Sequence, residues 1–259
     1  PPIPQDCVRI YLCRHGQTEY NRLKLMQGAR IDAPINDIGV MQAERLGKAL
    51  SQASPQPEMF FHSTLSRTRQ TALVATEQFV ESSTRNNKKH PIPLKVLPAL
   101  AEIDFGGPVE GVPVVEVRSK MVATYSAWGR GDISERMTSD GENFTEILSR
   151  AQAALFALTN AASSCESRCI AAVAHSTYIR MLLAAVQDVS LFQMSTLEQK
   201  NCCINVIDLR MDGALKTLGP KSKLFGGMLS QAPDTFECKV PLGTVLRTGE
   251  KRHLGELAV

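Results

Sequence analysis

The stretch CIAAVA at residues 169–174 is an uninterrupted apolar run. Such a run is typical of a strand that is buried on both faces of a parallel sheet. A helical pattern follows at 177–186, and the apolar stretch CINVIDL follows at 203–209. A strand, a helix and a second strand in this order predict part of an α/β fold.

The same alternation extends toward the N-terminus. Strands are expected in the apolar stretches VRIYLC at 8–13, MFFH at 59–62 and PLKVL at 93–97. Amphipathic helices are expected at 39–50, 66–80, 114–128 and 142–162. The sequence therefore predicts a three-layer α/β sandwich, in which helices flank both faces of a mostly parallel central sheet. We expect a single domain over residues 1–259, with an irregular C-terminal extension from about residue 211.

The composition limits the classes of partner. Hydrophobic residues make up 43% of the chain and charged residues 21%, which are the proportions of a globular protein. The formal net charge is +3, well short of the concentrated basic face of a nucleic-acid-binding protein. No apolar stretch approaches the roughly 18 residues that indicate a membrane-spanning helix. We therefore expect no nucleic acid and no membrane as a partner, and any preference for anions must be local.

The seven cysteines form an odd set without the density or regular spacing of a disulfide scaffold. Cys165 and Cys169 could share a metal, but no second pair lies at zinc-site spacing, so we expect buried or loop thiols. Free thiols favour a reducing compartment. The cytoplasm is therefore the expected location. Because the chain starts at Pro1 without a methionine, an organelle after removal of a targeting peptide is the alternative.

Charged and polar side chains follow four of the predicted strands. Arg14 and His15 end the first strand, Arg67 follows the second, Glu102 follows the third, and His175 comes directly after CIAAVA. Ligands of open α/β sheets bind at the carboxyl ends of the strands. We therefore expect these side chains to meet at one edge of the sheet.

These residue types suit phosphoryl transfer. Arginine forks match the geometry of phosphate oxygens, a neutral imidazole can act as a covalent nucleophile, and a carboxyl group can serve first as an acid and then as a base. Gly16, directly after His15, is expected to allow a sharp turn. Because two arginines and a second histidine would supply the positive charge, we expect no metal and no other cofactor.

Six motifs resemble the histidine phosphatase superfamily, which is also called phosphoglycerate mutase-like. They are RHGQTEYN at 14–21, QGARIDAPINDIGVMQAERLG at 27–47, STLSRTRQTA at 63–72, LAEIDFG at 100–106, GENFTEILSR at 141–150 and VAHS at 173–176. The resemblance covers roughly residues 8–209 and implies the phosphoglycerate mutase-like fold.

The resemblance also implies roles for individual residues. His15 would become the phosphohistidine, Glu102 would donate the proton to the leaving group, and the phosphate would be held by Arg14, Arg67 and His175. Further substrate-binding residues are expected in the same motifs, at Thr18, Asn21, Gln27, Gly28 and Ser176.

Two positions depart from the family pattern. Ser176 stands where the family commonly has a glycine after the second histidine, which would leave the backbone less free to turn. The loop after Glu102 contains FGGPVEG, with one residue more than the family pattern and no tryptophan. Asp104 and Glu110 are therefore kept as alternative proton donors.

Hydrolysis of a phosphomonoester is the favoured function, with a small phosphorylated metabolite, such as a sugar phosphate or a phosphorylated acid, as substrate. A phosphoglycerate mutase and a non-catalytic interaction module on the same fold are the alternatives. Mutases of the family carry a long basic insertion, whereas only about 38 residues with few basic side chains separate Glu102 from Gly141. Arg22, Lys24 and Arg30 could read a second anionic group of the substrate or form a solvated basic face. The sequence leaves open whether the chain forms a homodimer.

Overall fold

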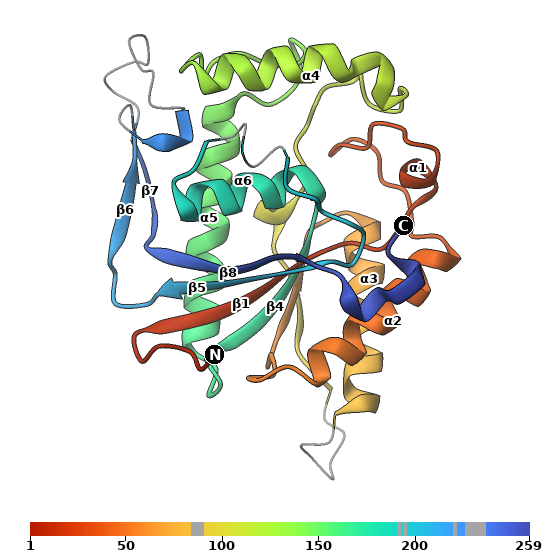
Figure 1. Ribbon diagram of the computed structural model, residues 1–259, viewed down its shortest axis with the longest axis vertical. Helices are drawn as coiled ribbons and strands as arrows, with labels where there is room; N and C mark the ends of the chain where they lie inside the picture. The colour runs from red at the N-terminus through yellow and green to blue at the C-terminus, as the bar shows by residue number, and fades with distance from the viewer. Residues whose placement is uncertain (84–90, 191–192, 194–195, 220–221, 226–236) are drawn as a thin grey trace.

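A six-stranded sheet forms the centre of the computed structural model, which describes residues 1–83, 91–190, 193, 196–219, 222–225 and 237–259. Its strand order is β3-β2-β4-β1-β5-β8 (Figure 1). The strands are β1 (Cys7–Arg14), β2 (Phe60–His62), β3 (Leu94–Val96), β4 (Cys169–Ala174), β5 (Ile204–Arg210) and β8 (Gly243–Glu250).

Most neighbouring strands of the sheet run parallel. β1 pairs with β4, β4 with β2, and β2 with β3 in parallel, whereas β5 is antiparallel to both β1 and β8. The CIAAVA stretch is β4, which lies between β1 and β2, and every residue of it is buried. The predicted mostly parallel sheet, with this strand covered on both faces, is therefore confirmed.

Helices cover both faces of the sheet (Figure 1). They are α1 (Glu19–Arg22), α2 (Asp37–Ser51), α3 (Ser66–Ser82), α4 (Val114–Gly129), α5 (Phe144–Ser163) and α6 (Ser176–Gln187), with short 3-10 helices η1 (Pro98–Leu100) and η2 (Lys223–Phe225). Among the described residues, no helix has both the length and the apolar character needed to cross a membrane.

The alternation of side chains along β1 divides the core into two clusters. Val8, Ile10 and Leu12 pack in one cluster with buried residues of α5 and α6. Tyr11 and Cys13 pack in a second cluster with buried residues of α2 and α3. Because successive side chains of a strand point to opposite faces, a strand of apolar residues requires cover on both sides. The predicted three-layer sandwich is confirmed.

Local sequence signals explain where the main helices begin. The Asn36 side chain accepts a hydrogen bond from the Gly39 amide at the start of α2. Asn143 and Glu146 form a capping box at the start of α5, each side chain accepting from the backbone amide of the other. Such caps satisfy amides that have no partner within the helix.

The segment after residue 211 is more regular than the sequence predicts. It contains β6 (Leu215–Leu218) and β7 (Cys238–Pro241), which pair with each other, and β8, which extends the main sheet. The 3-10 helix η3 (Arg252–Leu257) then packs against α2. The expectation of an irregular extension is corrected for these residues. β8 lies at the sheet edge with no fully buried residue, so its sequence carries no continuous apolar run.

All seven cysteines are free thiols. Six of them are buried, and Cys165 is partly exposed. Burial raises the pKa of the Cys165 thiol. The expectation of buried or loop thiols is confirmed.

Candidate active site

Four parallel strands deliver the predicted residues to one edge of the sheet. Arg14 is the last residue of β1, and His15 follows it. His175 follows β4 and precedes α6, and the ring centroids of His15 and His175 are 5.3 Å apart. Arg67 is the second residue of α3, which follows β2, and Glu102 lies in the loop after β3 and η1. The predicted convergence at the carboxyl ends of the strands is present in the fold.

Hydrogen bonding fixes the tautomer of His15. Its Nδ1 lies 2.7 Å from the carbonyl oxygen of Gly16. A carbonyl oxygen can only accept, so Nδ1 carries the proton and Nε2 carries the lone pair. Burial, followed by the positive charges of Arg67 and Arg14, holds the pKa of His15 well below its usual range. The imidazole is therefore neutral, with Nε2 available to form a covalent bond.

Gly16 is required for a reason that differs from the predicted turn. Its backbone does not adopt a positive φ. A Cβ atom at this position would lie 2.5 Å from the carbonyl oxygen of Gly39 at the start of α2. The glycine therefore allows β1 and α2 to approach closely next to His15.

His175 is held between Arg67 and Ser63 in the core of the site. Arg67 Nε donates to His175 Nδ1 at 3.1 Å, so Nε2 carries the proton and donates to Ser63 Oγ at 2.8 Å. The side chain is fully buried. Burial and the charge of Arg67 hold the pKa of His175 well below its usual range, so this ring is also neutral.

Arg67 is a buried cation without an ion-pair partner among the described residues. Its Nη1 donates to the Ile31 carbonyl at 2.7 Å and its Nη2 to the Gly28 carbonyl at 3.1 Å. Burial lowers the pKa of Arg67 to about 10. A buried charge without a counter-ion is costly, and an anionic ligand would relieve that cost. Gly28 contributes to this position through its carbonyl oxygen.

Two further donors are buried without a hydrogen-bond partner. Arg14 Nη1 donates to the Gln199 carbonyl at 2.6 Å, but Arg14 Nε has no partner among the described residues. Gln27 accepts from Thr18 Oγ1 at 2.8 Å, but its Nε2 is likewise unpaired there. Buried polar groups are almost always paired in native proteins. The unpaired donors of Arg14 and Gln27 would therefore suit an oxyanion ligand.

Glu102 points at the start of α6. Its Oε1 accepts from the amides of Ile103 and Tyr178, both at 3.0 Å, and its Oε2 accepts from the Thr177 amide at 3.3 Å. The side chain is 5% exposed, and burial raises the pKa of its carboxyl group. Of the carboxylates that act on Arg67, Glu102 has the strongest effect on the pKa. Such a group can carry a proton close to the two arginines.

The two alternative acids fasten the loop that follows Glu102. Asp104 forms an ion pair with Arg30 Nε at 2.7 Å and accepts from the Gly106 amide. Glu110 accepts from the amides of Arg30 and Phe105, at 2.9 and 3.2 Å. The extra residue of this loop thus lies downstream of Glu102, where Asp104 and Glu110 already have structural partners.

The remaining predicted residues lie around this centre with different surroundings. Thr18 caps α1 and is fully buried. Asn21 Oδ1 accepts from Asn201 Nδ2 at 3.0 Å. Ser176 is the first residue of α6, where a helical backbone needs no glycine, and its hydroxyl accepts from Arg180 Nη1 at 2.8 Å. The serine in place of the usual glycine is therefore accommodated.

The predicted site did not include Ser63, Asn201 or Arg180. Ser63 lies in the STLSRTRQTA motif, so its position could have been found from the motif. Asn201 Nδ2 donates to the His15 carbonyl at 3.1 Å, although it precedes a strand instead of following one. The reason is that β5 is antiparallel, so its first residues lie at the edge where β1 ends.

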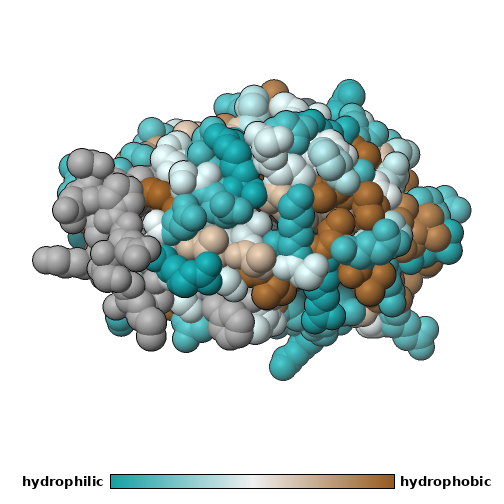
Figure 2. Space-filling model, turned by 90° about the horizontal axis from the view of Figure 1, so that it is seen from above, coloured by the Kyte–Doolittle hydropathy of each residue, from teal (hydrophilic) through white to brown (hydrophobic). Residues whose placement is uncertain are grey.

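A cavity of about 670 Å³ adjoins these residues. Arg14, Gln17 and Asn21 line it, as do the basic residues Lys24, Arg118 and Lys200. Arg118 belongs to α4, and Figure 2 shows the face of the molecule on that side, where hydrophilic residues surround separate hydrophobic patches.

The three basic residues predicted near the site differ in their partners. Arg22 pairs with Glu19 at 2.7 Å, and Arg30 pairs with Asp104 and Asp140. Lys24 lines the cavity and has no ion pair within the described ranges. Of the three candidates, Lys24 is thus the one placed to meet a bound anion.

Comparison with known proteins identifies similar chains. Residues 10–218 match the histidine phosphatase superfamily (branch 1). The chain is 31% identical over 149 residues to the fructose-2,6-bisphosphatase TIGAR of Xenopus tropicalis, covering 54% of this chain and 50% of that protein. It is 29% identical over 178 residues to the broad-specificity phosphatase YOR283W of Saccharomyces cerevisiae, covering 69% and 70%. It is 27% identical over 213 residues to a metal-independent phosphoserine phosphatase of Arabidopsis thaliana, covering 80% and 79%. The chain spans about half the length of the two Xenopus relatives.

Solved structures share the fold at low sequence identity. A phosphoglycerate mutase from Bacillus anthracis superimposes with a TM-score of 0.69 at 18% identity, over 97% of each chain. YhfR of Bacillus stearothermophilus superimposes with a TM-score of 0.61 at 24% identity, over 78% of this chain and 92% of that one. These similarities support the phosphoglycerate mutase-like fold.

Proposed function

We propose that this chain, which belongs to the histidine phosphatase superfamily, is a phosphatase that hydrolyses a phosphomonoester through a phosphohistidine at His15. The observation that carries the proposal is the state of His15: a neutral ring whose Nδ1 donates to the Gly16 carbonyl. Its free Nε2 lone pair lies in the same site as the unpaired buried donors Arg14 Nε and Gln27 Nε2.

In the first step, His15 Nε2 attacks phosphorus and the bond from phosphorus to the ester oxygen breaks. The protonated carboxyl group of Glu102 gives its proton to that oxygen, so the alcohol leaves neutral. Arg14, Arg67 and Gln27 supply donors for the equatorial oxygens of the transferred group. Burial, which raises the pKa of Glu102, favours the protonated form that this step needs.

In the second step, the carboxylate of Glu102 takes a proton from water as the water oxygen attacks phosphorus. The bond from phosphorus to His15 Nε2 breaks, and inorganic phosphate leaves. The ring returns to its neutral form because Nδ1 has kept its proton on the Gly16 carbonyl throughout. Glu102 is then protonated again and ready for the next ester.

The substrate is a small phosphorylated metabolite with a second anionic group. Lys24 and Arg118 line the cavity beside Arg14, and neither forms an ion pair among the described residues. The relatives named for fructose-2,6-bisphosphate and phosphoserine are named for substrates of this kind. A screen of sugar phosphates, sugar bisphosphates and phosphorylated acids for phosphate release tests the substrate class.

Trapping of the phosphoenzyme tests the reaction. Wild-type enzyme quenched during turnover should carry acid-labile phosphate, and His15→Ala should carry none and should not turn over. His62→Gln is the control, because His62 is buried beside the same sheet edge without contacting His15. Acid-labile phosphate that survives His15→Ala would overturn the assignment.

Two further assays distinguish a phosphatase from a mutase or an interaction module and test whether a metal is needed. Adding 3-phosphoglycerate with 2,3-bisphosphoglycerate should release phosphate, whereas interconversion of phosphoglycerates would indicate a mutase, and no turnover of any ester would indicate an interaction module. Turnover should persist in excess chelator, since arginine and histidine side chains surround the reacting group.

A further inference from the structure

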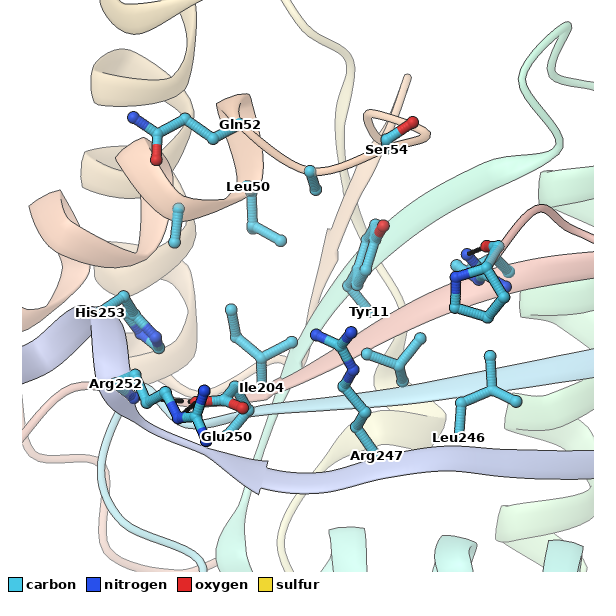
Figure 3. Close-up of a pocket in the computed structure, with 15 residues that line it drawn as sticks. Tyr11, Leu50, Gln52, Ser54, Ile204, Leu246, Arg247, Glu250, Arg252 and His253 are labelled. Atoms are coloured by element: carbon cyan, nitrogen blue, oxygen red, sulfur yellow. Dashed lines mark hydrogen bonds and ion pairs between the residues drawn. The ribbon is translucent and has the colours of Figure 1, made fainter.

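A second cavity lies on the α2 side of the sheet (Figure 3). Its volume is about 430 Å³, which is within the range of small-molecule sites. It is lined by residues of β1, β5, β8, α2 and η3, and it shares no lining residue with the cavity beside Arg14. The proposed reaction gives it no role.

One wall of this cavity is apolar. Tyr11, Leu50 and Ile204 line it from β1, α2 and β5, and Leu246 adds to it from β8. The Tyr11 hydroxyl is already bound to the Pro55 carbonyl at 2.9 Å, so its ring is the part that faces the cavity. This wall suits the hydrocarbon body of a ligand.

One guanidinium group in the cavity lacks a partner. Arg247 projects from β8 toward Tyr11 in Figure 3, and it forms no hydrogen bond or ion pair with any described residue. The other arginines are different. Arg9 is neutralised by two hydrogen bonds of 2.8 Å to Asp208, and Arg252 lies 3.9 Å from Glu250. Arg247 is therefore the guanidinium of this cavity that has no hydrogen bond or ion pair among the described residues, and its charge contributes to lowering the pKa of Glu250 in the same cavity.

Two hydrogen bonds connect this cavity to the proposed nucleophile. His253, which lines the cavity, donates from Nε2 to the Cys202 carbonyl at 3.0 Å. The Cys202 amide donates to the His15 carbonyl at 3.2 Å. Cys202 has a φ of 55°, in the left-handed region that non-glycine residues rarely adopt. A residue held in a costly conformation by its neighbours can respond when one of those neighbours moves.

We propose that this cavity is a regulatory site for a small organic anion with an apolar body. The anionic group, a carboxylate or a phosphate, pairs with Arg247, and the apolar body lies against Tyr11 and Leu246. Occupancy displaces His253 and thereby changes turnover at His15 through Cys202. The binding part of this inference is independent of the proposed reaction, and the effect on turnover rests on it.

Binding is tested with 3-phenylpropanoate as the anionic probe and 3-phenylpropanamide as its neutral counterpart, by calorimetry. Wild type should bind one equivalent of the carboxylate and bind the amide at least tenfold more weakly. Arg247→Gln should weaken carboxylate binding at least tenfold. Arg69→Gln is the matched control, because the Arg69 side chain is also exposed and has no hydrogen bond or ion pair with the part of the chain that the structure describes, but does not line the cavity. A repeat with phenylphosphonate, which resists hydrolysis, compares phosphorus-based anions with carboxylates.

The effect on turnover is measured at saturating p-nitrophenyl phosphate, where competition for the catalytic site is eliminated. The carboxylate should change kcat at least twofold in wild type and in Arg69→Gln but not in Arg247→Gln. His253→Leu should keep the binding and lose the change in kcat. Unchanged kcat in the wild type, or equal carboxylate binding by Arg247→Gln and the wild type, would each overturn the proposal. Thermal melting of Arg247→Gln checks that the variant is folded.

Discussion

At the scale of single residues, proton positions decide what the site can do. His15 is kept neutral by burial and by two arginines, while burial keeps Glu102 able to hold a proton. Burial lowers the pKa of His15 and raises the pKa of Glu102, and in both cases it favours the uncharged form of the side chain. A neutral nucleophile and a protonated acid are the pair that the first step of the proposed reaction requires.

The acid is tested by the identity of the leaving group. Glu102→Gln should slow turnover of an alkyl phosphate by on the order of 100-fold. It should slow p-nitrophenyl phosphate much less, because a nitrophenolate leaves without a proton. With that substrate the variant should accumulate phosphoenzyme and give a burst, since the second step also needs the carboxylate. Steady-state and rapid-quench kinetics measure both effects.

Glu110→Gln is the matched control for the acid, because Glu110 is a carboxylate that fastens the same loop to Arg30 and Phe105. It should affect both substrates alike. If Glu110→Gln or Asp104→Asn gives the selective pattern and Glu102→Gln does not, the acid is misassigned.

The neutral state of His175 should appear in the pH dependence of stability. Its pKa in the folded protein lies well below that of the unfolded chain, because of burial and Arg67. Its contribution to stability is therefore complete above the unfolded pKa of about 6.5 and is lost as the pH falls below it. Between roughly pH 6 and 5, the free energy of unfolding of the wild type should decrease more steeply than that of His175→Gln, by up to about 1.4 kcal/mol per pH unit. Urea unfolding across this range gives both slopes; parallel slopes would show that His175 is protonated in the folded protein.

At the scale of elements, strand direction decided which site residues the sequence could predict. The charged residues and histidines that follow a parallel strand were predicted, because all such strands end at the same edge, whereas Ser63, which follows β2, was not. Asn201 was missed, because β5 runs the other way and contributes the residues before its start. β8 was missed as a strand, since its edge position leaves it without the apolar run that made β4 recognisable.

The contact between α2 and α3 depends on a glycine. A Cβ atom at Gly47 would lie 2.2 Å from the Ala75 carbonyl oxygen, which belongs to the backbone of α3. Gly47→Ala should therefore destabilise the protein by on the order of 1–3 kcal/mol, although alanine favours a helix. The free energy of unfolding measures the change.

Gly129→Ala is the control for this helix contact. Gly129 ends α4, and a Cβ atom there meets nothing within 4 Å. The substitution should leave stability unchanged or raise it by up to about 1 kcal/mol. Equal effects of the two alanines would mean that α2 and α3 are farther apart than described.

At the scale of the whole molecule, the cavity beside Arg14 combines segments distant in sequence. Lys24 follows α1 and Arg118 belongs to α4, yet both line it. Lys24 was predicted from the sequence but Arg118 was not, because the residue pattern of a helix does not predict which distant loop its exposed side faces. The charged residues at the strand ends could be predicted from the sequence. The residues that line the outer part of the cavity could be identified only from the folded structure.

Lys24 and Arg118 should bind the second anionic group of the substrate, which is not transferred to His15. Lys24→Gln and Arg118→Gln should each raise KM about fivefold for 3-phosphoglycerate, which corresponds to about 1 kcal/mol for an exposed ion pair. Neither should change KM for p-nitrophenyl phosphate, which lacks a second charge. Lys48→Gln, on the exposed side of α2, is the control. A KM for 3-phosphoglycerate that stays at the wild-type value in both variants would remove the second anion from the substrate proposal.

The hydrogen bonds from the first turn of α6 to Glu102 have a consequence for how the loop after Glu102 can vary. Because those amides belong to Thr177 and Tyr178, two and three positions after His175, Glu102 and the second histidine are fixed at the same helix end. Phe105 and Val109 of this loop are buried in the core, whereas Gly107 and Pro108 are exposed, so insertions or exchanges at 107–108 are expected to leave Glu102 in place. Changes in this loop are then a way to alter the substrate range without moving Glu102 or His175.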